Sequence, residues 1–278
     1  MNSRNTNFTA QLFEEFKASF LKDLRSYVRY PAWVLGEFIS TPLWFFFFAL
    51  GVTLFASTTS TASSSGVGGM SFFFFGFIFI ILFSTSVWGV GQSVRNEQTA
   101  GTLEQFFLAP VNRITLIVGR WARIFLTDII IISYTTLILY LLGGGLVRLL
   151  DPALFLFSLG LYEIALIGFG LLVAAFTLRI KSYSTLANLI FFGYMILTGA
   201  LFPVTVIPMP FRVVSLAIPF TYFNDLMRHA ALGGPTILPE TSEYVAGILL
   251  SIAMLLVGLI AFNKIEKQAR IQGSIGTS

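Results

Sequence analysis

The sequence predicts an all-α integral membrane protein, and its composition and its apolar runs support this prediction. Hydrophobic residues make up 56% of the 278 residues and charged residues only 11%, with a mean hydropathy of +0.84. Soluble domains carry roughly 25% charged residues. Apolar runs of about 20 residues, long enough to cross the hydrocarbon core of a bilayer, recur along the chain. We therefore expect six transmembrane helices.

Residues 1–32 predict an amphipathic helix that lies in the membrane interface. Apolar side chains recur every three or four positions from Phe8 to Tyr30, with acidic and basic side chains between them. Pro31 is expected to stop this helix. The alternative is a soluble helix that packs against a partner protein.

The transmembrane domain is expected to occupy residues 33–263. Its six predicted spans are 33–56, 71–94, 114–142, 153–178, 183–202 and 243–263. The segment 203–230 between spans five and six is apolar, but it contains Pro203, Pro208, Pro210 and Pro219. Proline leaves backbone groups unpaired inside a span, so we expect short re-entrant outer helices here. Residues 264–278 are expected to form a cytoplasmic tail.

The distribution of basic residues predicts the orientation of the chain. With the N-terminus inside, only Arg148, Arg212 and Arg228 of the seventeen Lys and Arg residues fall on the outer side. Positive residues concentrate on the cytoplasmic side of membrane proteins, so both termini are expected to be cytoplasmic. Because the basic residues flank spans and do not form a patch, no nucleic-acid partner is expected.

The sequence lacks the motifs that would give it catalytic chemistry of its own. It contains no Cys and a single His, His229, which rules out thiolate ligands and histidine clusters, so no metal site is expected. None of the five lysines ends a GxxxxGK[ST] loop, so the chain has no P-loop for ATP. No catalytic residues and no cofactor on this chain are expected.

A polar insert, RNEQTAGTLEQFFLAPVNR at 95–113, separates the second and third predicted spans. Gly101 interrupts it, Thr102 can cap a following helix, and Glu104 would favour the dipole at that helix's N-terminus. Leu103 and the apolar run 106–108 give the helix an apolar face, and Pro110 ends it. Such a cytoplasmic helix could dock into a soluble partner or lie on lipid headgroups, and local physics leaves both open.

This insert resembles the coupling segment of permeases of the type-2 ABC transporter family (ABC-2). The matching residues are Glu97, Gly101, Thr102, Leu103, Glu104, Phe106, Phe107, Leu108, Pro110 and Arg113. A second segment, before the last span, resembles the family's P-x-x-Y-x-x-D-x-x-R pattern. Its residues are Pro219, Tyr222, Asp225 and Arg228. The resemblance covers nearly the whole chain.

The resemblance implies the permease subunit of an ATP-driven exporter in the plasma membrane, the inner membrane of a prokaryote. Such a permease pairs with a second permease copy or a homologous permease. It also pairs with two copies of a cytoplasmic ATP-binding cassette ATPase, which would hold ATP and Mg. The substrate would be amphipathic or hydrophobic, such as a drug, an antibiotic, a lipid or a lipid-linked glycan. The chain is thus expected to be a transport subunit and not an enzyme.

The resemblance also implies roles for individual residues. Glu97, Glu104 and Arg113 would contact the ATPase surface through charge-assisted bonds. Leu103 and Phe106 would fill the ATPase groove, and Gly101 would permit the bend. Tyr222, Asp225 and Arg228 lie at helical spacing after Pro219, which suggests structural support at the outer face, or gating of the exit.

Charged residues inside the predicted spans form a further candidate site. Asp128 and Glu163 lie where burial of a charge costs about 2.5–3.5 kcal/mol, so each should be paired or hydrated. Either could face a substrate pathway or pair between helices. They also leave open an alternative, an ion-coupled secondary transporter or channel. Arg120 and Arg123 are expected to extend toward the cytoplasmic headgroups.

Overall fold

The structure, a computed structural model, describes residues 3–56, 69–99, 101, 111–143, 149–177, 180 and 182–272, and these form helices joined by turns, without strands. The helices of the first half are α1 (Ser3–Val28), α2 (Pro31–Ala56), α3 (Gly69–Ser84), the π-helix η2 (Thr85–Gly91), α4 (Gln92–Thr99) and α6 (Arg113–Gly143). Those of the second half are α7 (Pro152–Thr177), α8 (Tyr183–Leu197), the 3₁₀ helix η3 (Val204–Val206), α9 (Met209–Leu216), α10 (Pro219–Leu232) and α11 (Glu240–Gln272). The all-α prediction is confirmed for these residues.

Three helices of the described chain have both the length and the apolar composition to cross a membrane. They cover Ser71–Glu97, Pro152–Thr177 and Glu240–Gln268. Helices α2 and α6, of 26 and 31 residues, match the first and third predicted spans in range. Helix α8 is apolar but has only 15 residues, or about 22 Å. The number of six spans stays a prediction.

Three boundaries differ from those expected. Helix α8 ends at Leu197, before the predicted end of the fifth span at 202, because the chain turns at Gly199, whose φ is +73°. Helix α11 continues to Gln272, so much of the predicted tail is helical. Helix α1 already ends at Val28, and Pro31 is the first residue of α2, where a missing N–H costs nothing.

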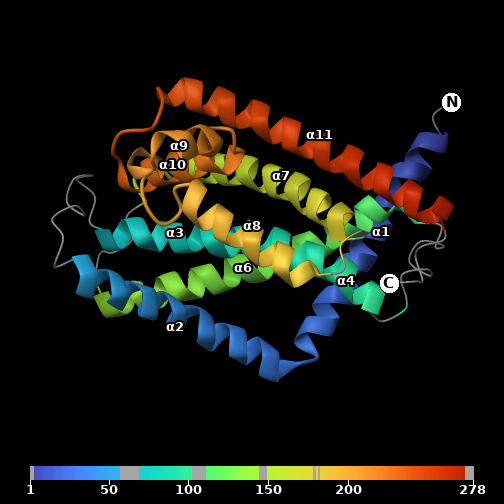
Figure 1. Ribbon diagram of the computed structural model, residues 1–278. Helices are drawn as coiled ribbons and strands as arrows, with labels where there is room; N and C mark the ends of the chain where they lie inside the picture. The colour runs from blue at the N-terminus through green and yellow to red at the C-terminus, as the bar shows by residue number, and fades with distance from the viewer. Residues whose placement is uncertain are drawn as a thin grey trace.

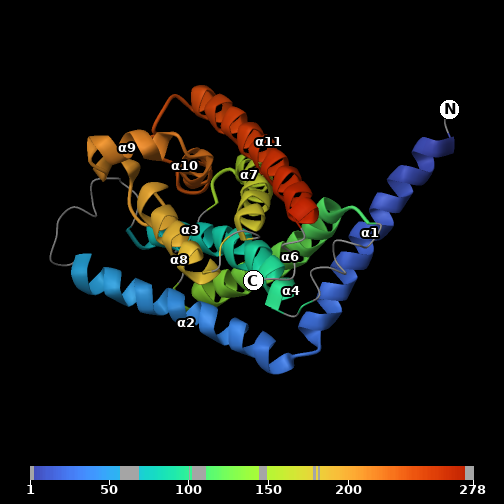
Figure 2. The same cartoon turned by 45° about the vertical axis from the view of Figure 1, so that its right-hand side comes forward.

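The long helices form a bundle whose two ends differ. Helices α7 and α11 lie side by side, and α2 lies on the opposite side of the bundle from α11 (Figures 1 and 2). Helix α1 crosses one end of the bundle, where it packs chiefly against α6 (Figures 1 and 2). Helices α9 and α10 lie at the other end. The segment 203–230 is therefore built from short helices, at the end away from α1.

Glycines allow the closest helix contact in the bundle, between α7 and α11. A Cβ atom on Gly258 would lie 2.0 Å from the carbonyl oxygen of Gly168, and one on Gly168 would lie 2.5 Å from the Cα of Leu255. Small residues let helix backbones approach in membranes, where packing and not the hydrophobic effect holds helices together. This contact fixes α11 against the centre of the bundle.

A π-helical turn interrupts the helix that runs from α3 into α4. One side chain and one backbone group of the turn bond neighbouring helices: the hydroxyl of Ser86 donates to the carbonyl of Leu166 at 2.8 Å, and the carbonyl of Val87 accepts from the hydroxyl of Tyr183. Such turns widen a helix locally and free backbone groups for other partners. Here the two bonds join the turn to α7 and α8, immediately before α4 in the chain.

Candidate functional site

The polar insert is described only at its two ends. Thr102, Leu103, Glu104, Phe106 and Pro110 lie outside the described residues. Gly101 has a φ of +68°, a left-handed conformation that favours glycine, and no atom of the described residues lies within 4 Å of a Cβ placed there. A bend at Gly101, directly after α4, thus agrees with its expected place in the insert.

Arg120 joins the three helices around the insert. Its Nε donates to Asp23 Oδ2 of α1 at 2.9 Å, and its Nη2 donates to Glu97 Oε1 of α4 at 3.4 Å. All three side chains are mostly buried, with 17%, 15% and 23% of their surface exposed. The guanidinium is therefore held by two carboxylates and does not simply extend toward headgroups. Glu97, expected to face an ATPase, has a partner within this chain.

The far end of the insert is fixed by α1 and α11. The backbone N–H of Asn112 donates to Glu15 Oε2 of α1 at 3.0 Å, and the Ser19 hydroxyl donates to the Leu116 carbonyl at 2.8 Å. Arg113 forms an ion pair with Glu266 near the end of α11, with Nε and Oε1 3.4 Å apart. Both ends of the insert are thus attached to helices of this chain.

A charged cavity of about 690 Å³ lies between α1, α2, the η2–α4 stretch and α6. Its charged lining residues are Lys22, Asp23, Glu37, Glu97, Arg120, Arg123 and Asp128, and its aromatic ones are Tyr27, Trp33 and Trp88. Asp128, which the sequence suggested as a possible pathway residue, thus lines this cavity. The other charged residues come from four separate helices. The spacing of residues along the sequence therefore could not predict that they line one cavity.

Glu37 is the acceptor at the centre of one wall of this cavity. It accepts a hydrogen bond from the hydroxyl of Tyr27 at 2.5 Å and another from the indole N–H of Trp33 at 3.0 Å. Burial, and then the Glu37 carboxylate, raise the pKa of the Tyr27 phenol far above its ordinary value. Arg123 lies over the ring of Tyr27, with 5.1 Å from its Cζ to the ring centroid.

Glu163 lies apart from the charged cavity. It is a buried residue of α7, 6% exposed, and its Oε1 has no hydrogen-bond partner among the described residues. The indole of Trp121 is the polar group beside it, and Asp128 is close enough to interact electrostatically. Asp128 and Glu163, the two candidate pathway residues, therefore have different surroundings.

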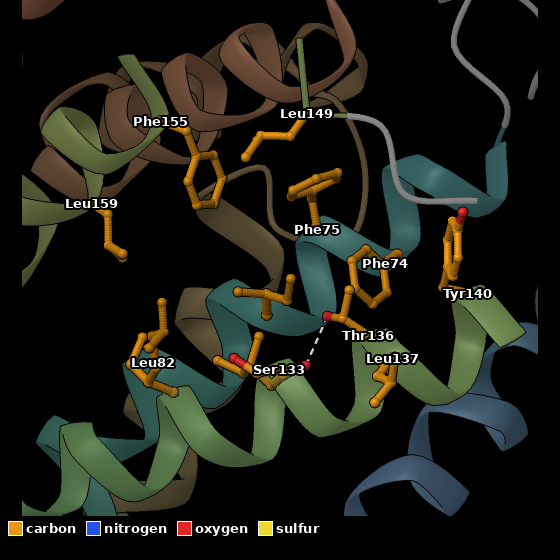
Figure 3. A pocket seen from close by; sticks show the side chains of 13 residues that line it. Phe74, Phe75, Leu82, Ser133, Thr136, Leu137, Tyr140, Leu149, Phe155 and Leu159 are labelled. Atoms are coloured by element: carbon orange, nitrogen blue, oxygen red, sulfur yellow. Dashed lines mark hydrogen bonds between the residues drawn. The ribbon is translucent and has the colours of Figure 1, made fainter. Parts of the chain in front are cut away.

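Two apolar cavities lie further along the bundle. One, of about 430 Å³ between α2, α3 and α8, is lined by aromatic side chains such as Trp44, Phe45, Phe73 and Phe191. The other, of about 530 Å³, lies between α3, α6 and α7, where Phe74, Phe75 and Phe155 face the hydroxyl-bearing side of α6 (Figure 3). In α6, Thr136 bonds its hydroxyl to the Ile132 carbonyl of its own helix at 2.7 Å.

The residues of the second motif hold the loops at the other end of the bundle. Pro219 begins α10, and the hydroxyl of Tyr222 donates to the Leu216 carbonyl at 2.6 Å. Asp225 Oδ2 accepts from the backbone N–H of Ile237 at 2.8 Å. The side chains of Tyr222 and Asp225 thus bond segments outside the motif, and their role in structural support or gating stays a prediction.

Arg228 is buried, 7% exposed, although the sequence placed it on the outer side. Its guanidinium donates to the carbonyls of Gly199 and Ala200, the first at 2.6 Å, and lies 3.6 Å from the ring centroid of Phe72. These bonds satisfy carbonyls that the early end of α8 leaves free. Asn224, which sequence reasoning missed, adds a bond to the Thr198 carbonyl at 3.1 Å.

Comparison with known proteins identifies the family of the chain. The chain matches the family model of the ABC-2 family transporter protein over residues 49–264. The sequence matches no curated protein. The matched range contains the insert, the charged α6 helix and the second motif, and it spans well over half of the chain. The chain therefore belongs to the ABC-2 transporter family, as a permease subunit.

Proposed function

We propose that this permease exports an amphipathic or hydrophobic substrate from the cytoplasm or the inner leaflet, using ATP hydrolysed by a separate subunit. Family membership implies an ABC transporter assembly with an ATPase. The fuller assembly is part of the proposal: two copies of the ATPase, which bind ATP and Mg, and a second copy of this permease or a homologous one. Both termini and the insert then face the cytoplasm.

The observation that carries the proposal is the double ion pair of Arg120. The insert is the expected contact for the ATPase, and Glu97, on the helix that enters it, is bonded to Arg120 on the helix that leaves it. Arg120 is in turn bonded to Asp23 of α1. A displacement of the insert would thus be passed to α1 and α6 together, because charge-assisted bonds resist separation inside a partly buried site. Leu103, Glu104 and Phe106 are proposed to make the ATPase contact.

The cavities support a pathway for an amphipathic molecule. The charged cavity and the aromatic cavity share the lining residues Thr41, Ile81 and Ser84. A polar chamber that adjoins an apolar one suits a molecule with a polar and an apolar end. Asp128, in the charged cavity, is the proposed pathway carboxylate, and Glu163 is not among the residues that line it.

The coupling role is tested by two substitutions in the insert. Glu104→Ala removes a charged contact, and Gly101→Pro removes the left-handed bend, because proline cannot adopt a φ of +68°. We expect both variants to insert into the membrane but to lose stable co-purification with the ATPase, and to lose most substrate-stimulated ATP hydrolysis. The measurement is pull-down and ATPase activity of the complex in nanodiscs. Wild-type values for both variants would contradict the assignment.

The alternative function, ion-coupled transport, is favoured by one observation: Glu163 is a buried carboxyl whose Oε1 lacks a hydrogen-bond partner among the described residues. Buried carboxyls in spans commonly carry protons in transporters. Uptake or release driven by a proton gradient in liposomes without ATP, and abolished by Glu163→Gln, would establish this function in place of the first.

A further inference from the structure

The charged cavity carries more negative than positive groups. Its lining contains four carboxylates, Asp23, Glu37, Glu97 and Asp128, and three cations, Lys22, Arg120 and Arg123. Arg120 is bonded to two of the carboxylates, Asp23 and Glu97. Its charge is therefore already shared, and it is a poor partner for an incoming anion.

Glu37 accepts its side-chain hydrogen bonds from neutral donors. The Tyr27 hydroxyl and the Trp33 indole both bond to it, and neither cancels its charge. Arg123 stacks on the Tyr27 ring, and Asp23, Glu37 and Asp128 all act on it electrostatically. Lys22 is exposed on the rim. An anion entering the cavity would thus meet several carboxylates. A cation would instead meet the Glu37 carboxylate, which two hydrogen bonds already hold in place.

Two indole rings line the cavity together with this carboxylate. Trp33 and Trp88 keep 67% and 36% of their surface exposed. The bond from Trp33 to Glu37 fixes that indole ring beside the carboxylate. Aromatic faces attract cations, and tryptophan does so best. A carboxylate in a cavity that two indole rings also line therefore suits an alkylated ammonium group.

The cavity also has a continuation that would accept an apolar tail. Thr41, Ile81 and Ser84 line both the charged cavity and the aromatic cavity, where Trp44, Phe45 and Phe77 follow. The charged lining thus comes from α1, α2, α4 and α6, and the aromatic lining of the adjoining cavity comes from α2, α3 and α8. A ligand that fits both would have one charged end and a hydrocarbon or aromatic body.

We propose that the charged cavity binds the ammonium group of an amphipathic organic cation, whose apolar part lies in the aromatic cavity. Glu37 is the anionic partner of the ammonium group, and Trp33 and Trp88 are its aromatic walls. This inference rests on the proposed function, because it names the substrate class of that pathway. An amine-bearing lipid headgroup and a free amphipathic cation share this chemistry.

The test is equilibrium binding of radiolabelled dodecyltrimethylammonium to the permease in lipid nanodiscs, with the signal of empty nanodiscs subtracted. We expect saturable binding that dodecyl sulfonate, an anion with the same tail, does not displace. Glu37→Gln should weaken binding at least tenfold, and Trp88→Leu should weaken it severalfold. Glu240→Gln, which removes an exposed carboxylate at the start of α11 far from the cavity, is the matched control and should bind like the wild type.

Further measurements separate the outcomes. Displacement by dihexanoyl phosphatidylethanolamine, but not by dihexanoyl phosphatidylglycerol, identifies a lipid headgroup as the source, and no displacement by either identifies a free cation. Equal displacement by the sulfonate, or unchanged binding in both cavity variants, overturns the inference. Co-purification with the ATPase is measured separately. If the wild-type permease does not co-purify with the ATPase, the proposed function is contradicted. If it does co-purify but binds no cation, only this inference is contradicted.

Discussion

At the residue scale, single side chains join helices that the sequence leaves far apart. Arg120 binds a carboxylate from each of two other helices, and Arg228 binds two carbonyls beyond the end of α8. Both guanidiniums are mostly buried, so loss of their partners would leave a charge with little access to solvent. Their planar donors suit this task, because they bond two acceptors at once.

Arg120→Ala is expected to destabilise the protein by about 1–3 kcal/mol, since it leaves Asp23 and Glu97 mostly buried without their cation. Thermal unfolding of the purified chain in nanodiscs measures this. Arg29→Ala, at an exposed position in the turn after α1, is the control and should change stability little. The prediction is contradicted if the two variants unfold at the same temperature.

At the element scale, the approach of α7 to α11 depends on the absence of side chains. Gly168 and Gly258 bring backbone against backbone, and their helices form the most extensive contact among the described elements. The same helix α7 contains Gly160, where a Cβ atom would have no neighbour within 4 Å in the described part of the chain. Two glycines of one helix therefore have opposite roles.

Gly168→Ala is expected to force α7 and α11 apart and to cost about 1–3 kcal/mol, because backbone atoms of α11 cannot move independently. Gly160→Ala should leave stability unchanged or raise it by up to about 1 kcal/mol, through helix propensity alone. Unfolding midpoints of the two variants in the same nanodiscs decide between these signs. Equal losses of stability in the two variants would show that the close contact at Gly168 does not cause the destabilisation.

At the scale of the whole molecule, the two ends of the bundle carry different chemistry. The end with α1 and α4 has the ion pairs of Arg113 and Arg120 and the charged cavity, whereas the end with α9 and α10 is formed by short helices (Figure 1). This asymmetry agrees with the distribution of basic residues in the sequence. It supports the proposal that the first end faces the cytoplasm.

The orientation is open to a direct test, because the natural chain has no Cys. Thr205→Cys and Lys264→Cys place single thiols at exposed positions on opposite ends of the bundle. A membrane-impermeant maleimide should label Thr205→Cys in intact cells, and Lys264→Cys only after permeabilisation. The reverse pattern would show that the termini lie outside.

The sequence by itself determined the helical class, the ranges of α2, α6 and α7 to within two residues, the short helices of 203–230 and the family. These follow from apolar runs, prolines and contiguous motifs, which are properties of neighbouring residues. Only the tertiary structure decided the partner of Arg120, which lies 97 residues away in α1, the early end of α8, and the separate surroundings of Asp128 and Glu163. Hydropathy states that a helix is buried in lipid, but it carries no record of which helix lies beside it. That choice is made by packing, at contacts such as the glycines of α7 and α11.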